Sequence, residues 1–168
     1  MNLTILPKNL IEAATRAQAF VDDKPTQPIM GCAIIVAAND EITITVSGKA
    51  MSYVGRFPAT VTTPGTIAVN AGNLLTAAKT TLAGQGIISM DLADNLRIVC
   101  KAGKSKTTLI GLDPVTFPAV PTLDTGAVVT VAGPVLARLI DQTIKFAAPD
   151  DNKFGLNGIK FESSEAGL

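Results

Sequence analysis

The chain has 168 residues, 47% of them hydrophobic, and its 14 basic and 14 acidic side chains give a formal net charge of zero. This length suits one small domain and part of another, and the zero net charge argues against a strongly basic nucleic-acid binder. Because the sequence contains no histidine, it excludes Ser–His and Cys–His catalysis and metal sites built on imidazole.

The first predicted elements are a strand over residues 2–6 and a helix over residues 8–21. Pro7 suits the first turn of this helix, where its missing N–H costs nothing. Glu12 and Arg16 stand four residues apart on the polar face, the spacing of a helical ion pair. The apolar face follows helical spacing and consists of Leu10, Ala13, Ala14, Ala17, Phe20 and Val21.

Alternating and continuous apolar runs predict the next strands, at residues 30–38, 41–46, 52–61 and 66–69. The third of these contains Pro58, which we expect near a strand end or a bulge. Asn39–Asp40 is predicted to be a turn, and Gly103–Lys104 is another.

Asn70 is a good N-cap for a second predicted helix at residues 71–83, which Gly84 and Gly86 end. Its buried face is Leu74, Leu75, Ala78 and Leu82. Three strands follow at residues 87–92, 96–101 and 106–112, and the proline-containing segment 113–126 is predicted to be a connector.

Residues 129–162 repeat the pattern of residues 3–39, with a strand, a helix, a loop and an apolar strand led by glycine. Leu3 aligns with Val129 and Phe20 with Phe146, a spacing of roughly 126 residues, which is the size of a small domain. We therefore expect a first domain at residues 1–120, followed at 121–168 by a connector and the first part of a second copy. The helix of this copy, at residues 135–147, is predicted to bury Leu136, Leu139, Ile140, Thr143 and Phe146.

The order of elements predicts an α+β fold, with antiparallel sheets, two helices on one side and a partial second copy. Cys32 and Cys100 stand alone in apolar strands, so we expect buried free thiols in a reducing compartment. No apolar stretch reaches about 18 residues, and no signal-peptide pattern opens the chain. A cytoplasmic protein is expected, with no catalytic centre, metal or cofactor.

Three segments carry a resemblance to a known family: KPTQPIMGCAIIV at 24–36, FPAVP at 117–121 and FGLNGIKFE at 154–162. They resemble the bacterial DNA polymerase III beta subunit, the DNA sliding clamp, as does the internal duplication. In that family each subunit has three copies of one domain, and two subunits close a ring around duplex DNA. The resemblance implies a non-catalytic processivity factor that tethers the replicative polymerase. Here the match ends about halfway through the second domain.

Basic side chains on the polar faces of the predicted helices are candidate contacts to DNA phosphates. Such contacts are independent of sequence and sensitive to salt. The resemblance adds two positions in loops that face DNA in the family, and at a third position, Asp150, the family can present a neutral polar contact. The predicted DNA-binding residues are Lys8, Arg16, Lys24, Lys79, Arg138, Lys145 and Lys153.

The resemblance also implies a subunit interface on the strand at 106–112, which we expect to be an edge strand, with Thr107 and Leu109 at the interface. It places Leu156 and Lys153 on the wall of a pocket that binds peptides of the polymerase and the clamp loader. The rest of that pocket lies outside this sequence, so recruitment of either partner in the family's usual way is not expected.

An alternative hypothesis is a non-enzymatic α+β module that pairs with a partner protein through an edge strand and has no nucleic-acid role. The two hypotheses differ on whether the basic residues lie on one concave helical face.

Overall fold

The computed structural model describes residues 1–21, 25–48, 51–82, 84, 86–118, 120, 129–149 and 155–162. The chain divides into two compact units, Met1–Pro121 and Thr122–Leu168. None of the described helices is long and apolar enough to span a membrane.

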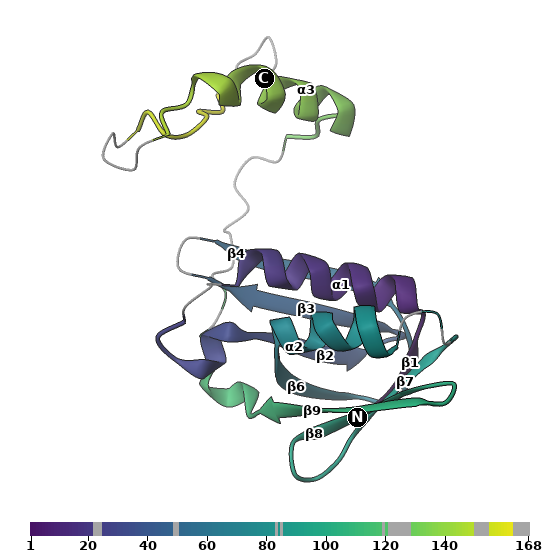
Figure 1. The fold of residues 1–168 in the computed structure, drawn as a ribbon. Helices are drawn as coiled ribbons and strands as arrows, with labels where there is room; N and C mark the ends of the chain where they lie inside the picture. The colour runs from purple at the N-terminus through teal and green to yellow at the C-terminus, as the bar shows by residue number, and fades with distance from the viewer. Residues whose placement is uncertain are drawn as a thin grey trace. The chain divides into compact units, whose positions relative to one another are not determined.

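The described residues of the first unit form nine antiparallel strands in the order β4-β3-β2-β6-β9-β8-β7-β1-β5 (Figure 1). The two outermost strands, β4 and β5, are consecutive in sequence, so the sheet must curl until its ends approach each other. The strands are β1 (Asn2–Ile5), β2 (Cys32–Ala38), β3 (Glu41–Ser47), β4 (Ser52–Pro58), β5 (Thr60–Thr63), β6 (Gly65–Asn70), β7 (Ile88–Leu92), β8 (Arg97–Ala102) and β9 (Ser105–Leu112).

Two helices, α1 (Pro7–Phe20) and α2 (Ala71–Thr76), pack together on the concave side of this sheet (Figure 1). The predicted α+β fold is confirmed. The buried face of α1 is also confirmed over Leu10, Ala13, Ala14 and Ala17. These side chains join the inward-facing residues of the strands in one core, whose largest fully buried members include Leu3, Ile35, Ile44, Leu74, Met90 and Ile98. The polar side of both helices is therefore left exposed.

The second helix begins as predicted, because the Asn70 side chain accepts a hydrogen bond from the Asn73 N–H at 3.0 Å. It continues past Thr76 as a π-helical turn, η2 (Ala77–Thr81), in which the Leu82 N–H donates to the Ala77 carbonyl. The π turn keeps Ala78 and Leu82 buried and leaves Lys79 on the exposed side.

The single strand predicted over residues 52–61 is wrong, because the chain breaks at Ala59 into β4 and β5. Pro58 cannot donate a ladder hydrogen bond. After Pro58, two hydrogen bonds to Asp40 hold the backbone. The Asp40 carbonyl accepts from the Ala59 N–H at 3.0 Å, and the Asp40 carboxylate accepts from the Val61 N–H at 3.1 Å. These bonds fix the corner where the two ends of the sheet meet.

The prediction that residues 106–112 form an edge strand is wrong. In the order of strands across the sheet, β9 lies between β8 and β6. Its pairing with β6 involves only Gly111 with Val69 and Leu112 with Ala68. The chain turns into α2 directly after β6, so the ladder stops there. Along Ser105–Ile110 the described residues supply a partner strand only on the β8 side.

Both cysteines are buried and free, as predicted. Burial, and to a smaller degree the charge of Asp91, raises the pKa of the Cys100 thiol to about 12. Cys32 belongs to a second small core on the outer side of β2 and β6, where η1 (Pro28–Gly31) covers it and Phe117, next to η3 (Pro114–Thr116), packs nearby. Neither thiol is placed to act as a nucleophile.

The second unit contains a helix, α3 (Gly133–Thr143), and a 3-10 turn, η4 (Ile144–Phe146). Strands predicted at 129–131 and after Gly158 are wrong, since the described residues there have no ladder partner. Strands exist only as hydrogen-bonded pairs. The predicted burial is wrong for Ile140, Thr143 and Phe146, because all three are exposed and Phe146 is 88% exposed. No sheet in the described residues packs against this helix. Leu136 and Leu139 are half-buried.

Candidate nucleic-acid interface

The exposed side chains of α1, α2 and η2 form one surface of the first unit, called here the helical face. Lys8, Glu12 and Arg16 lie along α1 at four-residue spacing, so they make one stripe about 12 Å long. Lys79 lies exposed on η2, which contacts α1. The first unit thus brings three of the predicted DNA-binding residues to the same side of the sheet.

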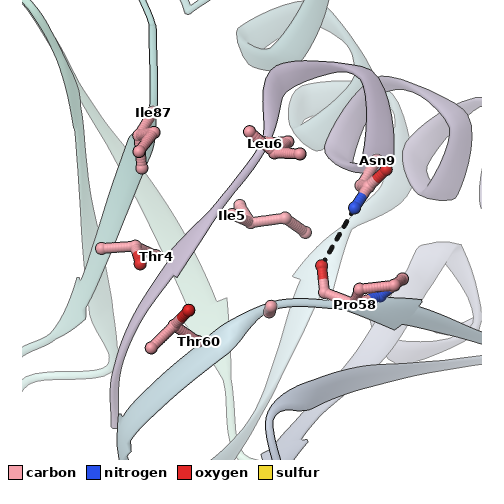
Figure 2. Close-up of a pocket in the computed structure, with 8 residues that line it drawn as sticks. Thr4, Ile5, Leu6, Asn9, Pro58, Thr60 and Ile87 are labelled. Carbon is pink, nitrogen blue, oxygen red and sulfur yellow. Dashed lines mark hydrogen bonds between the residues drawn. The ribbon is translucent and has the colours of Figure 1, made fainter.

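The start of α1 is tied to the corner between β4 and β5. The Asn9 side-chain amide donates to the Pro58 carbonyl at 3.0 Å (Figure 2). Beside this bond is an open hollow of about 240 Å³, which Ile5, Leu6 and Ile87 line in part. The bond holds the first turn of the helix against the sheet and so fixes where Lys8 leaves the surface.

Arg16 is the most constrained basic side chain of the helical face. Its Nη2 atom donates to Glu12 Oε1 at 2.7 Å, which confirms the predicted pair. Glu12, and then a hydrogen bond with Tyr53, raise the pKa of the Arg16 guanidinium. Tyr53 in turn stacks on Phe20, with ring centroids 5.1 Å apart. The guanidinium therefore stays charged, and its ion pair with Glu12 holds it on α1.

The helical face has a small positive charge. Lys8, Arg16 and Lys79 supply three positive charges and Glu12 one negative charge, since α1, α2 and η2 contain no other charged residue, which gives a net charge of +2. Near Lys79 the exposed side chains are neutral and polar, such as Asn73 and Thr76. Such a surface can hold phosphate oxygens without reading bases.

The remaining predicted DNA-binding residues do not join this group. Arg138 on α3 and Lys145 on η4 are exposed in the second unit, at a spacing of seven residues, with Asp141 between them. Lys24 and Lys153 lie outside the described residues, as does Asp150. Their contribution stays a prediction.

Sequence reasoning missed a basic cluster at the hairpin that joins β8 and β9. Lys101, Lys104 and Lys106 are all exposed there, and Lys101 pairs directly with Lys106 across the ladder. The predicted turn at Gly103–Lys104 is confirmed, with a positive φ of 55° at Gly103. Three lysines within six residues are a sequence pattern that would have predicted this basic cluster. They lie on the sheet, away from the helical face.

The predicted interface residues lie on β9 beside α2. Thr107 is half-buried and Leu109 is 6% exposed within the core. Both line a shallow hollow of about 280 Å³, together with Asn73, Thr76, Ala77, Thr108 and Ile110. In the second unit, Leu156 is 63% exposed. The described residues contain no group of His, Cys, Asp and Glu side chains that could hold a metal ion.

Comparison with known proteins shows which family this domain belongs to. The sequence model of one family, described as the N-terminal domain of the DNA polymerase III beta subunit, matches residues 1–121. This chain belongs to that family. The match covers the whole curled sheet with both of its helices.

Similar curated proteins in this family carry the name beta sliding clamp. The one from Caulobacter vibrioides is 26% identical over 159 residues, which are 95% of this chain and 43% of the relative. The one from Pseudomonas putida is 27% identical over an alignment of 168 positions, which covers 98% of this chain and 44% of the relative. The chain thus spans less than half the length of these relatives.

Solved structures of the family share the fold. The DNA polymerase III subunit beta from Pseudomonas aeruginosa matches with a TM-score of 0.85 at 26% identity, over 94% of this chain and 43% of the other. The Caulobacter crescentus pol III beta structure matches with a TM-score of 0.84, also at 26% identity, over 94% of this chain and 42% of the other. The sliding-clamp fold predicted from the sequence is confirmed.

Proposed function

We propose that this chain is part of a DNA sliding clamp, a non-catalytic processivity factor in the cytoplasm that encircles duplex DNA and tethers the replicative polymerase. The observation that carries the proposal is the helical face, which gathers Lys8, Arg16 and Lys79 on one side of a domain of the clamp family. Its partners would be duplex DNA, the polymerase and the clamp loader. The expected assembly is a homodimeric ring.

In this function the basic side chains contact phosphates and not bases. The helical face is built from helix exteriors, with neutral polar side chains between the cations. Phosphate contacts carry no sequence information, and a tether that reads no sequence can move along DNA. Arg138 and Lys145, and the loop residues Lys24 and Lys153, would add contacts of the same kind.

The open side of β9 is the proposed subunit interface. Residues 105–110 have a described partner strand only on the β8 side, so their other side can receive a strand from a second molecule. Thr107 and Leu109 would meet that strand, and Thr107 opens onto the hollow beside α2. Leu156, with Lys153, would lie on the wall of the pocket for partner peptides.

The same open side of β9 also favours the second candidate, an interaction module without a nucleic-acid role. DNA binding separates the two candidates. Binding by this chain is expected to be weak, in the range of about 10⁻⁴–10⁻⁶ M for non-specific contacts, because its formal net charge is zero.

The test is a titration of the chain with two fluorescent duplexes of unrelated sequence at increasing salt. We expect equal affinities for both duplexes and a steep loss of binding as salt rises. Binding that survives high salt, or that prefers one duplex, would contradict phosphate tethering. Absence of binding at low salt would leave the interaction module as the better candidate.

A further inference from the structure

We propose that Glu12 competes with DNA phosphate for the Arg16 guanidinium and thereby weakens the hold of the helical face on DNA. The inference rests on the proposed function, since it concerns how strongly the same face binds the same ligand. In this role Glu12 lowers the affinity of the helical face for DNA, which an exposed helix residue does not ordinarily do.

The first observation is the position of Glu12. It is the single acidic residue among the residues of α1, α2 and η2, and its carboxylate lies 2.7 Å from Arg16 Nη2. Both side chains are more than half exposed, at 53% and 56%. An incoming phosphate can therefore reach the guanidinium, but it meets a charge that is already compensated.

The second observation concerns Tyr53 of β4, whose hydrogen bond contributes to the raised pKa of Arg16. The Tyr53 ring is stacked on Phe20. A Cβ at position 55 would collide with the Tyr53 hydroxyl, so Gly55 leaves the space that this ring occupies. Among the described residues, Glu12 is the one carboxylate paired with Arg16.

The preference of Arg16 for Glu12 is small enough that DNA can reverse it. An exposed ion pair at a spacing of four residues on a helix favours the paired form only about twofold. A phosphate can take the place of Glu12, but it has to overcome that preference and the repulsion from the released carboxylate. A processivity factor that moves along DNA benefits from such a weakened contact.

The experiment compares the parent chain with Glu12→Gln in duplex DNA binding by fluorescence anisotropy over a series of low salt concentrations. We expect Glu12→Gln to bind about two to five times more tightly. The slope of log K against log salt should steepen by at most about 0.9, the contribution of one complete phosphate contact.

Glu41→Gln is the matched control. Glu41 lies 3.7 Å from Arg56 on the outer side of β3 and β4, so the variant changes the net charge equally and leaves the helical face intact. A second control combines Glu12→Gln with Arg16→Gln. If Glu12 acts by competing for Arg16, this double variant binds DNA no more tightly than Arg16→Gln alone.

Three results would overturn the inference. Equal tightening by Glu12→Gln and Glu41→Gln would reveal a general charge effect, and tightening in the Arg16→Gln background would reveal direct repulsion of DNA by Glu12. No tightening by Glu12→Gln, while Lys8→Gln weakens binding, would refute the competition and leave the proposed function standing. If Lys8→Gln and Lys79→Gln also change nothing, the proposed function itself fails.

Discussion

Replacing Lys8, Arg16 and Lys79 together by glutamine is expected to weaken duplex DNA binding and to flatten its dependence on salt. Each basic side chain that neutralises a phosphate contributes about 0.9 to the salt slope. Among the described residues, no ion pair joins Lys8 or Lys79 to a carboxylate, whereas Arg16 is paired with Glu12. The slope should therefore fall by at least about 1.8, the share of the two lysines.

This change in slope is large enough to measure by anisotropy. Between about 50 and about 200 mM salt, it corresponds to a roughly tenfold smaller loss of affinity for the triple variant than for the parent. The matched control replaces Lys101, Lys104 and Lys106 of the β8–β9 hairpin by glutamine, which removes the same charge from the sheet. An equal effect of the two triple variants would contradict a specific role of the helical face.

Gly111→Ala is expected to lower the free energy of unfolding by about 2 kcal/mol, within the range for overpacked cores. A Cβ at this position would lie 2.6 Å from Ile67 Cδ1 and 2.9 Å from the Leu96 carbonyl oxygen. Ile67 is fully buried and the second contact is backbone, so neither can move away easily. Gly111 is also one of two β9 residues that pair with β6, so the strain falls where the two halves of the sheet join.

The measurement is thermal unfolding followed by circular dichroism, in which the midpoint should fall by roughly 10 °C. Gly133→Ala is the control, since a Cβ there has no neighbour within 4 Å and its effect should stay within about 0.5 kcal/mol. Equal midpoints for Gly111→Ala and the parent would show that β6 and β9 are not joined this closely.

The elements of the first unit could be predicted because burial leaves a periodic trace in the sequence. In β3, Ile42, Ile44 and Val46 alternate with half-exposed residues, and their burial follows that alternation. In α1, the spacing of small apolar residues gave the buried face directly. Both patterns are local, so they required no knowledge of the neighbouring strand.

The pairing of strands could not be predicted in the same way. The position of β9 between β8 and β6 depends on the close approach of Gly111 to Ile67, and nothing in the local pattern of residues 105–112 encodes it. The break at Ala59 depends on bonds to Asp40, which lies on another turn. Both are tertiary contacts between segments distant in sequence.

The candidate site was predictable in part for the same reason. Helical spacing placed Lys8, Glu12 and Arg16 in one stripe and predicted their ion pair. No local pattern indicates that Tyr53 stacks on Phe20, because a strand and a helix have to pack before those rings meet. The second unit shows the limit of periodicity: Phe146 lies at a position predicted to be buried, and it is exposed because no described residue covers it.

NMR can locate the surface of the chain that contacts DNA. The chain, labelled with ¹⁵N, would be titrated with a short duplex at low salt, and the shifted backbone amides would be located on the structure. We predict that the shifts concentrate on α1, α2 and η2, around Lys8, Arg16 and Lys79. Shifts concentrated on the β8–β9 hairpin or on the outer side of β3 and β4, with the helices unchanged, would contradict the account.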